Sequence, residues 1–271
     1  MKNVSILLYP FFIALLLIQS SAFSQSQSKG TNLCIEGDKH CTFVLLSETN
    51  NQLHIINEAR AKTALSPFST FKITNSVIAL EQGVVNDSKQ VLTYDKNKYP
   101  TQAWWPPVWK LPSYNLGSAF KYSVVPVFRQ MATDIGQQNM KVSLERLNYG
   151  NQDISSGLDD FWLNGSLKIS SVEQIDFLQK LYQNQFNLTS VTLSTIKEIM
   201  LVETTGKYKL YGKTGAGKVD DKTMLGWYVG FVENDKGVHY FAFNFNRDSY
   251  AQMKAERVST VINHLKVAGI I

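Results

Sequence analysis

The chain has 271 residues and a formal net charge of +5, and charged side chains occupy 18% of its positions. Basic and acidic residues are interspersed without long runs of one sign, which is typical of a solvated surface and argues against a nucleic-acid partner. Four histidines and two cysteines, without paired cysteine motifs, give no basis for a metal site, so no metal is expected.

Residues 1–24 have the pattern of a secretory signal peptide. Lys2 precedes an apolar run over residues 6–18, and a small-residue cleavage site follows near residue 24. The run is shorter than the roughly 20 apolar residues of a membrane span, although an uncleaved N-terminal anchor is a second interpretation. We therefore expect one domain over residues 25–271, periplasmic or secreted, with no membrane attachment after cleavage.

Cys34 and Cys41 follow this leader closely. Export to an oxidising compartment favours a disulfide, but two reduced cysteines in and before a first strand are an equal alternative. The sequence leaves this choice open.

The first half of the domain begins with strands and continues with a helix. Apolar and β-branched residues over 41–47 and 52–58 flank an Asn-Asn turn and predict a β-hairpin. A helix is predicted to begin at residue 69 or 70 and to run to residue 81, with Gly83 ending it.

The middle of the chain is first irregular and then helical. Residues 84–122 are rich in tryptophan and proline and predict irregular structure, in which Trp105 and Trp109 either line the mouth of a cleft or pack as surface aromatics. Over residues 126–203 apolar residues recur with a helical period, interrupted by a looped stretch at 148–167.

One later helix is predicted to begin at Ser170 or Ser171, with Gln174 as its capping-box partner. Aromatic and β-branched residues then predict strands over residues 207–215, 224–233 and 238–246. A final helix is predicted to bury the face formed by Val258, Val261, Ile262 and Leu265. This order predicts an α/β (α+β) fold: an antiparallel β-sheet flanked by helices, with an inserted mostly helical subdomain.

The pattern Ser-x-x-Lys occurs at residues 26–29, 69–72, 118–121 and 194–197. Only the second copy opens an apolar helix, where Ser69 lies near the positive end of the helix dipole and Lys72 lies one turn further on the same face. Apolar neighbours would bury Lys72 and lower its pKa, because desolvation disfavours the ammonium form. In the alternative interpretation, Ser69 only caps the helix and Lys72 extends into solvent.

The tripeptide Lys213-Thr214-Gly215 occurs once, at the end of a predicted edge strand. A lysine and a hydroxyl, with a glycine that clears space beside them, suit the recognition of a carboxylate. Together with the earlier Ser-Thr-Phe-Lys, this tripeptide is typical of β-lactamases and penicillin-binding proteins.

Six motifs make the chain resemble the class D β-lactamases, the oxacillinases, within the penicillin-recognising serine enzymes. They are Ser69-Thr70-Phe71-Lys72, Ser123-Val124-Val125, Tyr149-Gly150-Asn151, Trp162-Leu163, Lys213-Thr214-Gly215 and Trp227-Tyr228-Val229-Gly230. They follow the order of that family from about residue 41 to the C-terminus. Patterns of the class A and class C enzymes are met only in part, whereas the class D pattern is met at every element.

The resemblance implies a serine β-lactamase that hydrolyses the amide bond of β-lactams, penicillins among them, and confers antibiotic resistance. Ser69 would attack the lactam carbonyl and form an acyl-enzyme. Lys72, carboxylated to N6-carboxylysine, would be the general base for acylation and deacylation. Trp162 would donate its indole N–H to this carbamate, and Val125 and Leu163 would wall the pocket. Carbon dioxide or bicarbonate would supply the carboxyl group, and no other cofactor is expected.

The resemblance also implies how the leaving group and the oxyanion are handled. Ser123 would lie between Ser69 and Lys213 and pass a proton to the leaving nitrogen. The backbone N–H groups of Ser69 and Ala216 would form the oxyanion hole.

The substrate carboxylate would be bound by Thr214 and Arg257, while Gly215 and Val125 would contact the substrate. Arginine suits this role because its guanidinium offers two parallel donors. Arg247 competes for the assignment, and Arg257 is preferred because it is expected to open the final helix.

Two other functions remain open at this point. The sensor domains of β-lactam receptors share these motifs, become acylated and do not turn over, and they normally follow several membrane spans. A cell-wall transpeptidase would usually carry additional domains. A monomer and a homodimer are both compatible with the sequence, and no nucleic-acid partner is expected.

Overall fold

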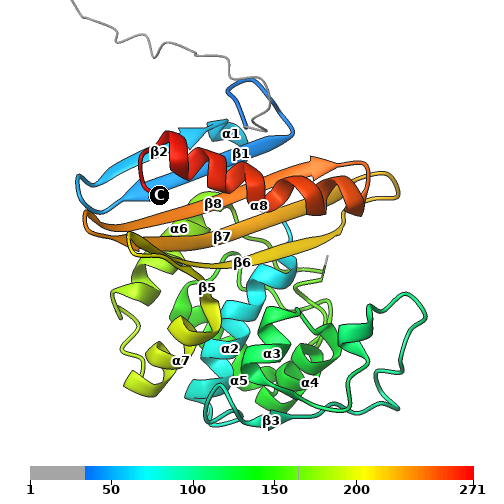
Figure 1. Cartoon of the computed structure of the whole chain (residues 1–271). Coiled ribbons are helices and arrows are strands. Elements are labelled where there is room, and N and C mark those ends of the chain that lie inside the picture. Colours follow the sequence, from blue (N-terminus) through cyan, green and yellow to red (C-terminus); the bar gives the residue numbers. More distant parts are fainter. Residues whose placement is uncertain (1–33, 164) are drawn as a thin grey trace, which may run out of the picture. The chain divides into compact units, whose positions relative to one another are not determined.

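Six strands form an antiparallel sheet in the order β2-β1-β8-β7-β6-β5 (Figure 1). Its strands are β1 (Cys41–Ser47), β2 (Gln52–Ile56), β5 (Leu201–Thr204), β6 (Tyr208–Lys218), β7 (Met224–Asn234) and β8 (Gly237–Arg247). A computed structural model describes residues 34–163 and 165–271. The predicted signal peptide, residues 1–24, and the first residues of the predicted domain lie outside this part.

Helices account for most of the remaining structure. They are α1 (Glu58–Ala61), α2 (Lys72–Glu81), α3 (Leu116–Lys121), α4 (Val125–Ile135), α5 (Gln137–Leu147), α6 (Ser171–Tyr182), α7 (Ser190–Met200) and α8 (Tyr250–Val267). Two short 3-10 turns, η1 (Phe68–Phe71) and η2 (Pro107–Trp109), and a small two-stranded sheet of β3 (Val91–Leu92) and β4 (Tyr114–Asn115) complete the described elements.

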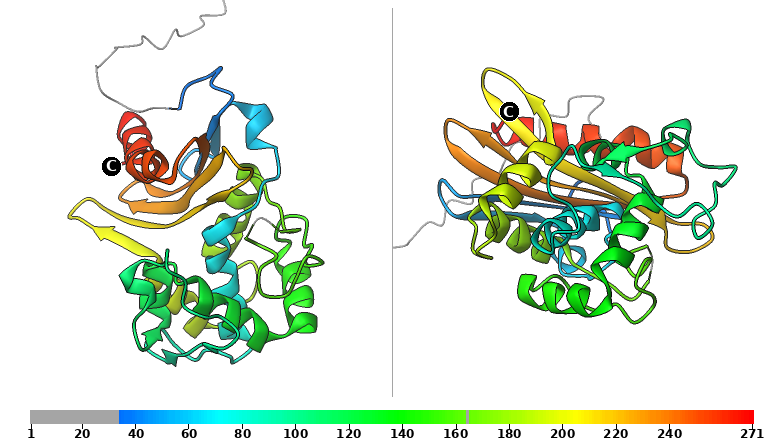
Figure 2. Two further views of the ribbon diagram at one scale, coloured as in Figure 1. Left: turned by 90° about the vertical axis from the view of Figure 1, so that its right-hand side faces the viewer. Right: turned by 90° about the horizontal axis from the view of Figure 1, so that it is seen from below.

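The sheet separates two apolar cores. Helix α8 covers one face, where Val261 and Leu265 pack with Phe241 and Phe243, and helices α2 to α7 lie on the other side (Figures 1 and 2). Strands β7 and β8 are therefore buried on both faces, which explains why their sequences are nearly continuous apolar runs. The predicted α/β fold with an inserted helical region is confirmed.

The helix expected from residue 69 or 70 begins only at Lys72. Ser69 lies instead in the 3-10 turn η1, where the Thr70 N–H donates to the Pro67 carbonyl at 3.1 Å. Phe68 has a left-handed backbone with φ of 48°, so the chain turns sharply before the helix is established. The predicted start of the helix was therefore wrong, and the alternative in which Ser69 only caps the helix is excluded.

Three other local predictions need correction. The capping box of α6 pairs Ser170 with Glu173 and not with Gln174, because Ser170 is the N-cap and the residue three places after it reaches back to its N–H. Residues 201–204 form strand β5 instead of continuing a helix, because tertiary pairing with β6 overrides the helical period. Val258 is exposed, and Met253 belongs to the buried face of α8 in its place.

The Lys-Thr-Gly tripeptide lies on β6, which is not an outer strand of the sheet. Strand β5, however, pairs with β6 only from Lys209 to Tyr211. The part of β6 that carries Lys213, Thr214 and Gly215 therefore has β7 on one side and no β5 partner on the other. The prediction of an edge position holds for this segment of the strand.

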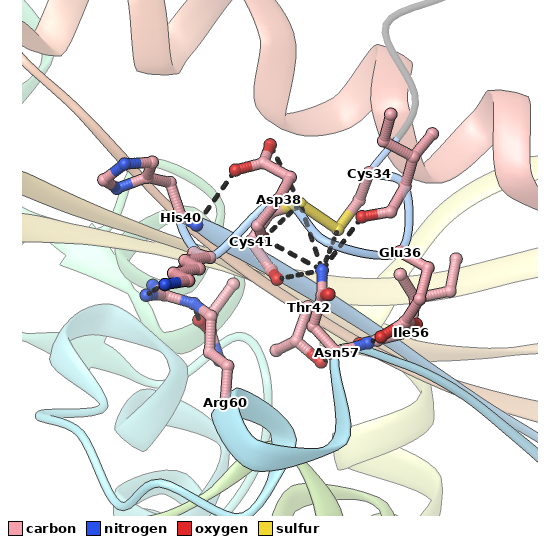
Figure 3. Close-up of a disulfide and its surroundings, with 12 residues drawn as sticks. Cys34, Glu36, Asp38, His40, Cys41, Thr42, Ile56, Asn57 and Arg60 are labelled. Carbon is pink, nitrogen blue, oxygen red and sulfur yellow. Dashed lines mark hydrogen bonds between the residues drawn. A yellow bond between two sulfur atoms is a disulfide. The ribbon is translucent and has the colours of Figure 1, made fainter.

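Cys34 and Cys41 form a disulfide that closes the segment before β1 (Figure 3). Asn57 lies beside it with φ of 59° and organises the loop. Its side-chain amide donates to the carbonyl oxygens of Ile35 at 3.0 Å, Asp38 at 2.9 Å and Cys41 at 2.9 Å. The sequence left open whether Cys34 and Cys41 are paired or reduced. In the structure they are paired, within a loop whose carbonyl groups converge on the Asn57 side chain.

None of the helices within residues 34–163 and 165–271 has the length and apolar character needed to cross a bilayer.

Candidate active site

Ser69 and Lys72 are in direct contact. The Lys72 Nζ lies 2.9 Å from the Ser69 Oγ, and the whole Lys72 side chain is buried while Ser69 is half-buried. Burial lowers the pKa of Lys72 from 10.5 to about 7, because the ammonium form loses its hydration. The alternative in which Lys72 extends into solvent is therefore excluded. At neutral pH a large fraction of this amine is unprotonated and can accept a proton from Ser69.

The surroundings of Lys72 come from distant parts of the chain. The Phe128 ring of α4 lies 5.1 Å from the Lys72 Nζ. Trp162 packs against Phe71, the neighbour of Lys72, with ring centroids 5.2 Å apart. The Phe68 N–H donates to the Trp162 carbonyl at 3.0 Å, which ties the loop carrying Trp162 to the serine turn. Apolar groups from three segments thus exclude water from the amine.

Trp162 carries an unsatisfied donor. Its side chain is fully buried, and within the described residues its indole Nε1 has no hydrogen-bond partner. A buried N–H without an acceptor destabilises the fold and usually marks a missing partner. An added acceptor in this pocket would satisfy it.

Ser123 and Lys213 form the second polar pair. The Lys213 Nζ donates to the Ser123 Oγ in a short contact and to the Thr214 carbonyl at 3.0 Å. Lys213 is buried, and its pKa is lowered well below the ordinary value, first by burial and then by the nearby positive groups of Lys72 and Arg257. Ser123 has a left-handed backbone with φ of 53°, in the turn between α3 and α4. This turn presents its hydroxyl to β6.

The serine turn lies directly on the Lys-Thr-Gly strand. A Cβ placed on Gly215 would be 2.9 Å from the Pro67 carbonyl oxygen and 3.1 Å from the Thr70 Cγ2. Only glycine leaves room for this approach. The two half-buried neighbours Thr214 and Ala216 flank this contact, on the segment of β6 that lies against the serine turn.

Two arginines were candidates for a carboxylate site. The Arg257 Nη1 donates to the Gly215 carbonyl at 3.1 Å, and its buried Nε has no partner within the described residues. Arg247 instead forms an ion pair with Glu256, with 2.6 Å between the Arg247 Nη2 and the Glu256 Oε2, and this carboxylate balances its charge. Arg257 lies well inside α8, so the expectation that it opens the helix was wrong. Its contact with Gly215 nevertheless places it at the Lys-Thr-Gly strand.

The remaining sequence-predicted residues lie around this centre. Val125 is the first residue of α4 and is half-buried, and Leu163 is half-buried against the helical core. Tyr149 is fully buried, and its hydroxyl accepts from the Gln174 amide at 3.3 Å. Asn151 holds the looped segment by donating to the Ser166 carbonyl at 2.9 Å. These last contacts support a scaffolding role for both residues.

Sequence reasoning missed Phe128 and also missed the specific contact that Trp109 makes. Phe128, over the Lys72 amine, is one of many apolar residues with helical spacing, and no sequence feature singles it out. The indole of Trp109 donates to the Tyr122 carbonyl at 2.8 Å, immediately before Ser123. Of its neighbours, Trp105 is buried and Trp104 is 71% exposed, so this tryptophan cluster combines packing with an exposed face.

Comparisons with known proteins agree with this geometry. The pattern of the penicillin binding protein transpeptidase domain matches residues 26–263. The β-lactamase OXA-48 of Klebsiella pneumoniae is 42% identical over 204 residues, which cover 75% of this chain and 74% of that protein. A class D β-lactamase structure, YbXI from Nostoc, superimposes with a TM-score of 0.79 at 32% identity and covers 85% of this chain and 94% of that one.

A longer relative is also similar. The methicillin resistance mecR1 protein of Staphylococcus aureus is 32% identical over 219 residues, which cover 80% of this chain but only 36% of that protein. The resemblance to β-lactamases is higher in identity and extends over most of the relative's length. The predicted family is confirmed, and the chain belongs to the class D β-lactamases, a family of serine hydrolases.

Proposed function

We propose that this protein hydrolyses the amide bond of β-lactam antibiotics through an acyl-enzyme on Ser69. The contact of 2.9 Å between the Ser69 hydroxyl and the buried Lys72 amine carries the proposal. A serine becomes an effective nucleophile when a base takes its proton, and a pKa of about 7 provides such a base at neutral pH. Acylation is therefore expected to slow as the pH falls below about 7, where Lys72 becomes protonated.

The second polar pair suits the departure of the lactam nitrogen. Ser123 is hydrogen-bonded to Lys213, so its hydroxyl can pass a proton to the leaving nitrogen and be reprotonated by the ammonium form of Lys213, which the lowered pKa makes a stronger proton donor. The backbone N–H groups of Ser69 and Ala216 would hold the developing oxyanion, a contribution of about 10²–10³ in rate for each donor. Thr214 and Arg257, both beside Gly215, would bind the substrate carboxylate, with Gly215 and Val125 in contact with the substrate.

The pocket also fits a carboxyl group on Lys72. Formation of the carbamate requires a neutral amine, and the lowered pKa of Lys72 meets this condition. The unsatisfied Trp162 N–H supplies a donor for the added oxygens. When present, this group would supply a carboxylate acceptor that replaces the free amine as general base for both acylation and deacylation. Carbon dioxide or bicarbonate would be its source.

We also propose that the protein is exported to the periplasm or secreted. The sequence of residues 1–24 has the signal-peptide pattern. The Cys34–Cys41 disulfide supports an oxidising compartment, because such bonds are rare in the reducing cytosol. An enzyme located there would meet β-lactams before they reach cell-wall synthesis.

The second candidate is a β-lactam sensor that is acylated and does not turn over. The match to the mecR1 protein supports it, because that relative aligns with 80% of this chain. Hydrolysis is preferred because the β-lactamase relative is more similar and is matched over 74% of its length.

The test is a time course of the mature protein with an excess of a chromogenic cephalosporin, with and without bicarbonate. Sustained turnover that rises with bicarbonate is expected, and the Ser69→Ala variant serves as the control without a nucleophile. A single stoichiometric burst that stops, even with bicarbonate, would favour the sensor. A wild-type protein that shows neither burst nor turnover would overturn the proposed function.

A further inference from the structure

The residue before the nucleophile has an unusual backbone. Phe68 has φ of 48°, a left-handed conformation in which a bulky side chain is strained. Such strain persists only where neighbouring contacts over-determine it. Here the Phe68 N–H donates to the Trp162 carbonyl at 3.0 Å, and only 3% of the residue's surface is exposed. The loop that carries Trp162 and the packing of the ring therefore hold Phe68 in place.

The Phe68 ring lies against the bare backbone of Gly217 on β6. A Cβ placed on Gly217 would be 2.0 Å from the Phe68 Cε1 and 2.4 Å from its Cδ1, and the three nearest atoms all belong to this ring. The ring thus fills the space that a side chain at position 217 would need. Real Cβ atoms do not approach so closely, so a larger residue would have to displace the ring or the strand.

Gly215 and Gly217 act together because alternate residues of a strand point to the same face. Gly215 makes room for the backbone at Pro67 and Thr70, and Gly217 makes room for the Phe68 ring. Ala216 lies between the two glycines. The serine turn is therefore seated on β6 at two successive positions of one face, one on each side of Ala216.

We propose that Phe68 is a positioning residue, whose ring, seated on Gly217, sets the separation between Ser69 and Ala216. Ser69 directly follows Phe68, and Ala216 directly precedes Gly217. Each of the two expected oxyanion donors is therefore the chain neighbour of one residue of the Phe68–Gly217 contact. The inference rests on the proposed function, because it assigns the contact a role in acylation. A ring that is buried and held by a strained backbone cannot adjust without moving Ser69.

The test is a double-mutant cycle of Gly217→Ala and Phe68→Ala, measured as the rate of labelling by a fluorescent penicillin with bicarbonate present. In the parent background, Gly217→Ala is expected to lower acylation roughly 10- to 100-fold, because the added methyl forces the turn off the strand. In the Phe68→Ala background the same methyl occupies the vacated space and should change the rate less than about 2-fold. The pH of half-maximal acylation should stay the same, because Lys72 is not altered.

Gly206→Ala is the matched control, since a Cβ at this exposed glycine meets no atom within 4 Å. Melting temperatures of all variants identify any that fail to fold. They also measure, without substrate, how the steric contact between positions 68 and 217 affects stability. The melting temperatures of the parent, the two single variants and the double variant could show that Gly217→Ala is tolerated better in the Phe68→Ala background. If they do, but Gly217→Ala acylates at the parental rate, the contact is only structural and the proposal is overturned. Equal losses from Gly217→Ala in both backgrounds would also overturn it.

The experiment separates this inference from the proposed function. Labelling or hydrolysis of the penicillin by the parent protein tests the acylation step of the proposed function, whereas the ratio of rates across the cycle tests the positioning role. A parent that is neither labelled by the penicillin nor hydrolyses it overturns both together. A parent that is labelled, with equal rates in all variants, overturns only the role of Phe68.

Discussion

At the scale of single residues, the site depends on amines that are kept away from water. Lys72 and Lys213 are both buried, and each has a lowered pKa for which burial is the largest cause. The positive charge of Lys72 lowers the pKa of Lys213 further, because like charges repel strongly where the dielectric is low. The same burial that costs folding free energy therefore keeps Lys72 available as a base.

Replacing Lys72 by Ala removes this base and keeps the serine. We expect slow acylation of the variant and almost no deacylation, with a loss of about 10²–10⁴-fold, the usual contribution of a general base. The measurement is a burst experiment with a chromogenic cephalosporin, followed by detection of the acyl-enzyme by mass spectrometry. Steady turnover equal to that of the parent would rule out Lys72 as the base for deacylation.

Replacing Trp162 by Phe removes one N–H and keeps an aromatic ring beside Phe71. The smaller ring leaves a cavity, and removal of the unsatisfied donor offsets part of its cost, so stability is expected to fall by only about 1–2 kcal/mol. If the indole holds a carbamate on Lys72, deacylation should fall at least about 10-fold and half-maximal turnover should need more bicarbonate, since one charge-assisted hydrogen bond is lost. An unchanged bicarbonate dependence, measured at a fixed pH, would contradict the role of Trp162.

At the scale of elements, the site is held where turns join. Ser123 lies in a left-handed turn between α3 and α4, and Trp109 of η2 fastens this turn through the Tyr122 carbonyl. Ser69 lies in a comparable turn between Pro67 and α2. Both hydroxyl groups therefore depend on short irregular segments whose shape is fixed by contacts from elsewhere in the fold.

Replacing Trp109 by Phe should loosen the Ser123 turn. The loss of one hydrogen bond of 2.8 Å corresponds to about 1 kcal/mol, or roughly a 5-fold lower acylation rate if the turn must be reset in the transition state. Trp104→Phe is the matched control, because it removes an indole from a side chain that is 71% exposed. Pre-steady-state rates of both variants give the comparison, and equal rates would show that the bond to Tyr122 has no influence on Ser123.

At the scale of the whole molecule, the first described residues are fastened to the last helix. The Cys34 N–H donates to the Nε2 of His264 in α8 at 3.1 Å, and the His264 ring stacks on Phe43 of β1 with centroids 4.2 Å apart. Burial, with a smaller effect of His54, lowers the pKa of His264 to about 4. Neutral His264 is thus part of the packing between the start of the sheet and α8.

This histidine predicts a loss of stability in acid. Its pKa is lower in the folded state, about 4, than the 6.5 of an unperturbed histidine, so the unfolded chain binds the proton first. The contribution is fully present above pH 6.5 and is lost as the pH falls toward 4, by about 3 kcal/mol in total. Urea unfolding of the parent and of His264→Gln at pH 7, 5.5 and 4 measures it. Parallel pH dependences of the two proteins would refute the assignment.

Local rules allowed the sequence to predict much of the fold. The hairpin of β1 and β2, the strands β6 to β8 and the helical middle follow from side-chain period and turn residues, which act over a few positions. Helical spacing over three residues likewise predicted that the Ser69 and Lys72 side chains lie close together. The order of the motifs identified the family. Local rules failed where tertiary pairing prevailed, as in β5, and where backbone strain displaced a helix start, as at Phe68.

The sequence by itself determined the candidate nucleophile, the order of the motifs and the α/β architecture, because these depend on residue type and local spacing. Only the tertiary structure decided that Lys72 is buried beside Phe128, since burial is a property of segments far apart in the chain. It also decided that Arg257, and not Arg247, faces Gly215, because Glu256 occupies the competing guanidinium. Long-range packing sets the pKa values and the charges that the chemistry requires, and no local pattern contains that information.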